Sequence, residues 1–206
     1  MDCLSDAERV KDKETEKLES LLEGDIDVSR HMVNSEAEFF AQISQLEQLV
    51  KDELTILHIS AHGVTNSRDP FYRSPGIAIS NDGSQIEWQS LREPLTSLNQ
   101  KTGGNLVLNL MACRGSNAFK IGSIQKVDAF RVVIGPHKDV LVRRIIPITE
   151  CFYGHLSRAQ WEFLATKTAM IAIDTLEGEC YFNAVSATTL ARWWNAKAIQ
   201  VRIDRA

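Results

Sequence analysis

Two short apolar runs constrain the fold of this 206-residue chain more than any other feature. One, Leu106 to Gly115, reads Leu-Val-Leu-Asn-Leu-Met-Ala-Cys-Arg-Gly, and the other, Thr55 to Gly63, reads Thr-Ile-Leu-His-Ile-Ser-Ala-His-Gly. Each run has the length of a strand and ends in a reactive side chain close to a glycine. Near-continuous apolar strands of this kind are typical of parallel sheets buried on both faces. We therefore expect an α/β fold in which adjacent strands carry His62 and Cys113 to one edge of the sheet.

The residue types at the two strand ends fit nucleophilic catalysis. A free cysteine thiol has a pKa of about 8.5 and is only slightly ionised at neutral pH, so a nucleophilic cysteine needs a base beside it. His62 is such a base, and it can later protonate the leaving amine. Alone, a cysteine after a strand is usually an inert core thiol, and a His-Gly pair is usually a strand end and a turn. The two motifs in this order, each closing an apolar strand, favour a Cys113–His62 dyad.

Together the motifs resemble those of the caspase-like cysteine peptidases. Met111-Ala112-Cys113-Arg114-Gly115 matches the caspase pattern Gln-Ala-Cys-Arg-Gly in all but its first position, and His62 lies 51 positions before Cys113, where caspases have about 50. The group also contains separases, metacaspases and bacterial CHAT domains. The resemblance implies a mostly parallel central sheet with helices on both faces and a small hairpin insertion. It also implies an oxyanion hole formed by the backbone N–H groups of Gly63 and Cys113.

The same resemblance implies a function. A caspase-like cysteine endopeptidase cleaves peptide bonds in a protein substrate, and water then hydrolyses the acyl-enzyme, with no metal and no organic cofactor. Small stand-alone bacterial members of the group commonly serve regulated proteolysis, including antiviral defence against phage. We therefore expect a protein substrate and an activating or regulatory protein partner.

Two other classes of protein stay open. A catalytically silent caspase-like scaffold would bind a partner through the same groove, although decayed peptidases usually lose the His-Gly or the Ala-Cys pair, and both are intact here. An unrelated doubly wound domain would bind a small ligand such as a nucleotide. The chain contains neither Gly-x-Gly-x-x-Gly nor Gly-x-x-x-x-Gly-Lys, the sequences that cradle phosphates, which weakens the second alternative.

Residues near Cys113 and after the next strand suggest a substrate specificity. In caspases and metacaspases, the residue two before the cysteine supplies a polar group to the pocket for the residue before the cleaved bond; here it is Met111, which is neutral. Separases also have Met there, and the Asp of their Gly-Asn-Leu-Trp-Asp-Val segment selects arginine. This chain has Gly135-Pro136-His137-Lys138-Asp139-Val140, with Lys138 in place of Trp. The match assigns Asp139 and Met111 to substrate binding and predicts cleavage after Arg or Lys. In the alternative, Asp139 caps the following helix.

Composition and cysteine spacing set further limits. The net charge of −4 indicates no basic surface for nucleic acid. No apolar run approaches the roughly 18 residues of a membrane span, and residues 1–20 are too charged for a signal peptide, so we expect a cytoplasmic protein without membrane contact. The four cysteines, Cys3, Cys113, Cys151 and Cys180, are widely spaced and form no Cys-x-x-Cys, which argues against a disulfide framework and a zinc site.

Residues 1–24 are expected to form a charged N-terminal arm or helix, and residues 25–206 the caspase-like domain. Within the domain, residues 25–33 are a candidate first strand. Ser35 then opens a helix, and Glu38 completes a capping box. The apolar face of this helix consists of Phe39, Phe40, Ile43, Leu46, Leu49 and Val50.

A loop over 64–76, a hairpin around Asn81-Asp82-Gly83-Ser84 and a linker over 114–128 are expected from their turn-forming residues. Further helices are expected over 90–100, 140–156 (interrupted or kinked at Pro147), 158–168 and 188–195. Further strands are expected over 129–135, 169–173 and 199–203.

Overall fold

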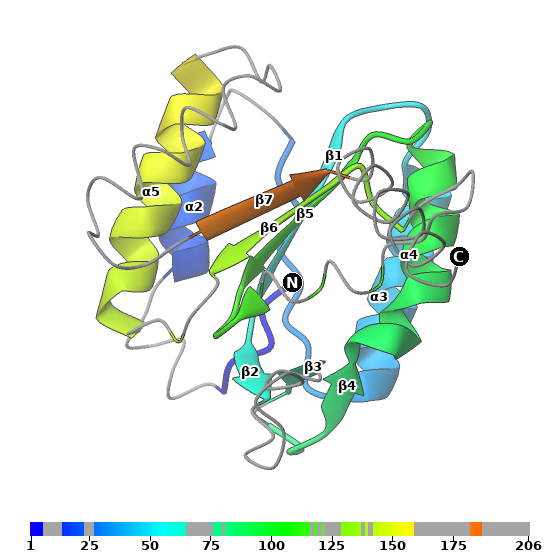
Figure 1. Ribbon diagram of the computed structural model, residues 1–206, viewed down its shortest axis with the longest axis horizontal. Helices are drawn as coiled ribbons and strands as arrows, with labels where there is room; N and C mark the ends of the chain where they lie inside the picture. The colour runs from blue at the N-terminus through cyan, green and yellow to red at the C-terminus, as the bar shows by residue number, and fades with distance from the viewer. Residues whose placement is uncertain are drawn as a thin grey trace, which may run out of the picture.

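The computed structural model describes residues 1–5, 14–22, 27–64, 76–79, 81–115, 118, 121, 129–136, 139, 142–158 and 182–186. Its central sheet has the strand order β1-β5-β6-β7 (Figure 1). Three of these strands, β1 (Thr55–Ser60), β5 (Leu106–Met111) and β6 (Val132–Pro136), are parallel, and β7 (Phe182–Ser186) is antiparallel to β6. The expected α/β fold with a mostly parallel sheet is therefore confirmed.

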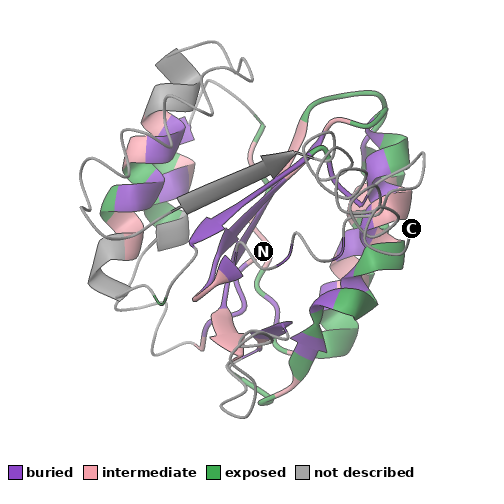
Figure 2. Cartoon of the chain, in the orientation of Figure 1, coloured by how far each residue is buried: buried purple, intermediate pink, exposed green. Residues whose placement is uncertain are grey.

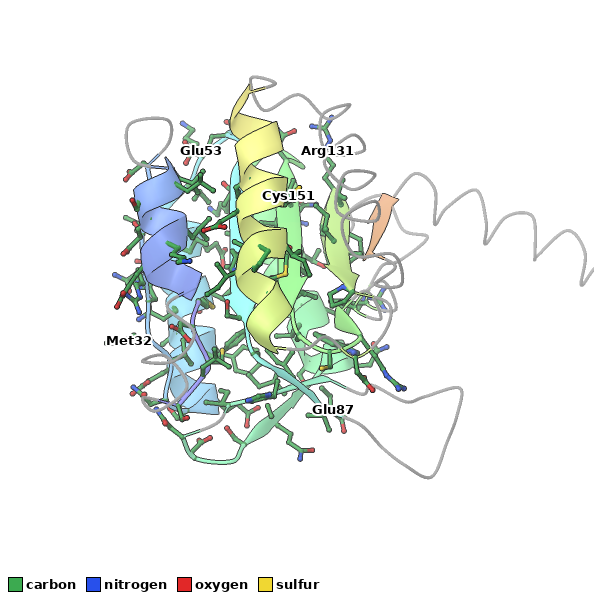
Figure 3. All side chains as sticks on the ribbon, turned by 90° about the vertical axis from the view of Figure 1, so that its left-hand side faces the viewer. Met32, Glu53, Glu87, Arg131 and Cys151 are labelled. Carbon is green, nitrogen blue, oxygen red and sulfur yellow. The ribbon has the colours of Figure 1, made fainter. Side chains whose placement is uncertain are left out.

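Helices cover both faces of the central sheet. On one face lie α2 (Glu14–Leu22) and α5 (Val142–Arg158), which pack side by side (Figure 3). On the other face lie α3 (Glu36–Leu49) and α4 (Trp88–Lys101), which also contact each other (Figure 1). The strands β1, β5 and β6 that lie between them are mostly buried, as Figure 2 shows. Among the helices of the described residues, none has both the length and the apolar character required to cross a membrane.

The two apolar runs form neighbouring strands that are buried on both faces, as predicted. β1 and β5 pair in parallel along their whole length, with Thr55 opposite Leu106 and Ser60 opposite Met111. Alternate residues point to opposite faces, so each strand contributes to two core layers. Leu57, Ile59, Leu106, Leu108 and Leu110 belong to the layer that contains α3 and α4 residues. Ile56, Val107 and Met111 belong to the layer that contains α2 and α5 residues.

A second, antiparallel sheet adjoins the carboxyl end of β1. It consists of β2 (His62–Val64), β3 (Gly76–Ala78) and β4 (Gln85–Glu87). β3 and β4 form the predicted hairpin, and in its turn the Asp82 carboxylate accepts hydrogen bonds from the hydroxyl and N–H of Ser84, which lower the pKa of Asp82. The predicted loop over 64–76 is wrong at both ends, because Val64 and Gly76 pair within this sheet, and residues 65–75 lie outside the described residues.

The N-terminal residues are built into the fold. The Cys3 N–H donates to the Ser60 carbonyl at 2.9 Å, and the Ser60 N–H donates to the Met1 carbonyl at 3.0 Å, so residues 1–3 lie along the free edge of β1. Asp2 also bridges to Met32, and this single bridge is the only part of the predicted strand over 25–33 found among the described residues. Leu18 and Leu22 of α2 pack in the same core layer as α5.

Helix boundaries agree with the sequence analysis except in detail. Ser35 caps α3 by accepting from the Glu38 N–H, but the Glu38 carboxylate accepts from the N–H of Asn34 and not from that of Ser35. Leu49, expected on the apolar face, is 71% exposed because it lies in the last turn. α5 continues through Pro147, which lies beyond the first turn of the helix and lacks the N–H for one helical hydrogen bond.

β7 is a strand that the sequence analysis did not anticipate. The predicted elements over 169–173, 188–195 and 199–203, and the predicted helix over 158–168 beyond Arg158, lie outside the described residues.

Candidate active site

The structure brings the two predicted dyad residues to neighbouring strand ends. Ser60 pairs with Met111, and the ladder extends one residue further, because the Ala61 N–H donates to the Met111 carbonyl at 3.2 Å. His62 and Cys113 each follow the last paired residue of their strand by two positions. Both are half-buried. The carboxyl edge of the parallel sheet, where open α/β sheets bind ligands, is therefore where both residues lie.

The close contact at position 63 explains why a glycine follows His62. A Cβ atom at Gly63 would overlap the carbonyl oxygen of Cys113 and would lie 2.9 Å from its carbonyl carbon and 3.0 Å from its Cβ. Real Cβ atoms do not approach backbone atoms so closely, so only glycine fits unless the backbone shifts. This contact fixes the backbone beside His62 directly against Cys113. The two residues predicted to form the oxyanion hole, Gly63 and Cys113, are therefore in backbone contact.

A tight turn presents Cys113 at the end of β5. The Gly115 N–H donates to the Ala112 carbonyl at 2.8 Å, which places Cys113 and Arg114 at the two central positions of the turn. Arg114 has a φ of 58°, a left-handed conformation that is uncommon for residues other than glycine. A Cβ at Gly115 would lie 2.5 Å from the Leu110 carbonyl oxygen, so the chain folds back onto its own strand. The Cys-Arg-Gly sequence therefore reverses the chain immediately after the candidate nucleophile.

Asp139 lies after β6, the strand on the other side of β5, and it is paired with Arg114. The guanidinium Nε donates to Asp139 Oδ1 at 2.8 Å, and a terminal nitrogen donates to Oδ2 at 3.2 Å. The Asp139 side chain is 58% exposed, so it is not the desolvated carboxylate expected of a closed pocket floor. The helix-capping alternative stays a prediction, because α5 begins at Val142 and residues 140 and 141 lie outside the described residues. Three consecutive strand ends thus contribute His62, Cys113 with Arg114, and Asp139.

Met111 lies deeper than the other predicted site residues. It is 3% exposed and packs in the core layer with Phe152 and Tyr153 of α5. Its side chain therefore stabilises the contact between β5 and α5. A contact between Met111 and substrate stays a prediction.

The sequence analysis missed a buried polar network beneath the strand ends. His58 Nδ1 lies 2.9 Å from the Tyr153 hydroxyl and 3.2 Å from Asn109 Nδ2, and Asn109 Nδ2 donates to the same hydroxyl at 3.1 Å. Because the amide nitrogen can only donate, His58 Nδ1 is the acceptor, and its Nε2 proton is directed to Ser60 Oγ at 3.2 Å. Asn109 Oδ1 is buried and accepts no hydrogen bond from the described residues.

This network had a signal in the sequence. Each apolar strand contains one residue with a bulky polar side chain, His58 in β1 and Asn109 in β5, and the parallel register places these two residues opposite each other. Burial of polar groups without partners is costly, so two such interruptions at matching positions predict a shared hydrogen-bond network. The third member, Tyr153, comes from the buried face of α5.

The cysteines in the described residues are Cys3, Cys113 and Cys151, and none of them forms a disulfide. Cys3 is buried beside β1, and Cys151 is half-buried on α5 (Figure 3), whereas Cys113 alone of the three lies at the carboxyl end of a sheet strand. Cys180 lies outside the described residues. Within the described residues, no group of three His, Cys, Asp or Glu side chains is arranged to hold a metal ion.

Comparison of the chain with known protein families, with curated proteins and with solved structures finds no match.

Proposed function

We propose that this protein is a cysteine endopeptidase with a caspase-like fold, in which Cys113 is the nucleophile and His62 is the general base and acid. The observation that carries this proposal is the contact between Gly63 and the Cys113 backbone at two adjacent parallel strand ends. It holds a histidine and a half-buried cysteine at the same edge of the sheet, at the start of a tight turn. This is the juxtaposition that a Cys-His peptidase needs.

The proposed reaction proceeds in two steps. His62 removes the Cys113 thiol proton while the sulfur attacks the carbonyl carbon of the peptide bond. The N–H groups of Gly63 and Cys113 stabilise the negative charge on the carbonyl oxygen. The C–N bond then breaks, the leaving amine takes the proton from His62, and a thioester remains. Water, deprotonated by His62, attacks the thioester and releases the acid, and the proton returns to the thiol.

Substrate class and regulation rest on the resemblance to the caspase-like group. Asp139 is proposed to favour an arginine or lysine before the cleaved bond, through charge and, for arginine, bidentate hydrogen bonds. Its position after β6, next to the Cys113 turn, supports this assignment, because Arg114 already shows that a guanidinium fits the Asp139 carboxylate. A cytoplasmic effector protease that is controlled by a protein partner, as in antiviral defence, is the corresponding proposed role.

The second candidate is a catalytically silent binding module that uses the same edge of the sheet. The Arg114–Asp139 ion pair favours it, because this pair already occupies the carboxylate that would otherwise recognise the substrate.

Covalent labelling separates the two candidates. A peptidyl arginine acyloxymethyl ketone should alkylate the parent protein at Cys113, and His62→Ala should slow the labelling strongly. Cys151→Ser is the matched control, since it removes another half-buried thiol, and should be labelled at the parent rate. Peptide mapping by mass spectrometry identifies the labelled residue. Labelling that persists in Cys113→Ala, or a parent protein that is not labelled, would exclude the peptidase.

A further inference from the structure

The residue next to the candidate nucleophile binds the residue proposed to recognise the substrate. Arg114 directly follows Cys113, and its guanidinium makes two hydrogen bonds to Asp139, at 2.8 and 3.2 Å. In the sequence, the two residues are separated by β6 and the segments that flank it. The pair therefore joins the Cys113 turn to the end of β6.

The length of the Arg114 side chain indicates how far Asp139 lies from the Cys113 turn. Consecutive Cα atoms lie about 3.8 Å apart, so the Cα of Arg114 is one residue step from the Cα of Cys113. From that point, a single arginine side chain reaches both carboxylate oxygens of Asp139. A substrate arginine whose carbonyl carbon is bonded to the Cys113 sulfur has its Cα four bonds from the Cys113 Cα, at a distance comparable with one residue step. The same side-chain length therefore suits both the internal and the substrate guanidinium.

The backbone conformation of Arg114 indicates that its side chain has a function at this site. The left-handed φ of 58° favours glycine at this position, and non-glycine residues in such conformations occur preferentially at functional sites. Arg114 is 21% exposed and Asp139 is 58% exposed at the side chain. An ion pair that water reaches to this extent is weak, so a second guanidinium can replace the first at small cost.

We propose that Arg114 is a specificity-determining residue of this site: its guanidinium occupies Asp139 in the substrate-free protein, and a substrate arginine binds by displacing it. This inference rests on the proposed function for its biological meaning, but its central claim concerns binding alone. The competition lowers the affinity for basic side chains and excludes ligands that cannot match the bidentate contact.

Agmatine, which carries a guanidinium on a four-carbon chain, is the probe, and titration calorimetry with the full chain gives its dissociation constant. Arg114→Gly removes the competing guanidinium and suits the left-handed backbone, so it should bind agmatine about fivefold more tightly than the parent. Asp139→Asn should bind no agmatine. Lys17→Gln is the matched control, because it also removes one cation from a solvent-accessible ion pair, in this case with Glu150 on α5. It should bind agmatine like the parent.

Three results would overturn the proposal. Arg114→Gly could bind agmatine no more tightly than the parent, Asp139→Asn could retain binding, or Lys17→Gln could tighten it equally, which would assign the effect to net charge.

The outcome is separable from that of the proposed function. If the agmatine series behaves as expected while no peptide is cleaved, the displacement is supported and the peptidase is not. If peptides are cleaved after arginine but Arg114→Gly has the parent affinity for agmatine, the peptidase stands and the displacement is refuted.

Discussion

The β1–β5 side and the β5–β6 side of the candidate site are held together by different kinds of contact. Between β1 and β5, the backbone of Gly63 touches the backbone of Cys113, and the two strands are paired in register up to that point. Between β5 and β6, the strand ends are joined through the exposed side chains of Arg114 and Asp139. Backbone contact in a close-packed region tolerates almost no change, whereas an exposed ion pair exchanges partners readily. The β1–β5 side is therefore suited to catalytic residues that must keep a fixed geometry, and the β5–β6 side is suited to residues that select a ligand.

The largest expected effect is at the dyad itself. Cys113→Ala and His62→Ala should each reduce peptide hydrolysis by up to about 10⁶-fold, and the double variant little further, because the two residues act as a unit. Hydrolysis of a fluorogenic arginyl peptide measures the rates. Cys151→Ser is the control and should keep the parent rate. Additive losses in the double variant would show that the two residues do not act together.

A smaller loss is expected when the backbone contact between the strand ends is disturbed. Gly63→Ala introduces a Cβ that overlaps the Cys113 carbonyl, so the His62 backbone must move away from Cys113. Misplacement by about 1 Å can reduce catalysis by about 10²-fold, and we expect a loss of this size in kcat/KM. Gly83→Ala is the control, because a Cβ there meets no atom within 4 Å, although the φ of 72° is unfavourable for alanine. It should lower stability without lowering activity.

The buried network below the β1–β5 side should affect stability more than rate. Tyr153→Phe removes the hydroxyl that contacts His58 and Asn109, so each of these two buried side chains loses one hydrogen-bond partner. The free energy of unfolding should fall by about 1–3 kcal/mol, as urea denaturation can measure. Adding Asn109→Leu should lower the stability further, because it removes the amide that still contacts His58 Nδ1. A double variant more stable than Tyr153→Phe would contradict the assigned network.

The smallest effect is expected on the β5–β6 side. Arg114→Gly loses an exposed ion pair worth about 0.2–1 kcal/mol and relieves a left-handed backbone that costs about 1 kcal/mol or more, so the two changes nearly cancel. Salt screens the ion pair but not the backbone term, so the variant should gain stability relative to the parent in 1 M NaCl, by less than about 1 kcal/mol. Urea denaturation at low and high salt measures this. A variant that is destabilised by several kcal/mol would show that the pair is part of the core.

The features that could be predicted from the sequence depend on residues close together in the chain. The features that were missed depend on contacts between residues far apart in the chain. β1, β5 and β6 were predictable because continuous apolar runs mark strands buried on both faces. The hairpin turn at Asp82 and the cap at Ser35 were predictable because their hydrogen bonds span at most a few residues. β7 has no such local mark, since it is a short segment that becomes a strand only by pairing with β6.

The same distinction applies to the site. The meeting of His62 and Cys113 at one sheet edge follows from two strand patterns and the rule that parallel strands end together. The Arg114–Asp139 pair does not follow from either residue alone, and the resemblance to separases assigned Asp139 to substrate binding without indicating a partner within the chain. The insertion of residues 1–3 beside β1 was likewise hidden, because the densely charged sequence that follows suggested a separate arm.

The central claim, that Cys113 forms a covalent intermediate with the help of His62, is tested most directly by trapping that intermediate. The parent protein is mixed with an arginyl peptide ester, quenched with acid within the first turnover, and analysed by intact-mass and peptide-mapping mass spectrometry. We expect an added acyl group on Cys113, with no adduct in Cys113→Ala and much slower formation in His62→Ala. Hydrolysis of the ester by Cys113→Ala at the parent rate, or an acyl group mapped to another residue, would contradict the account.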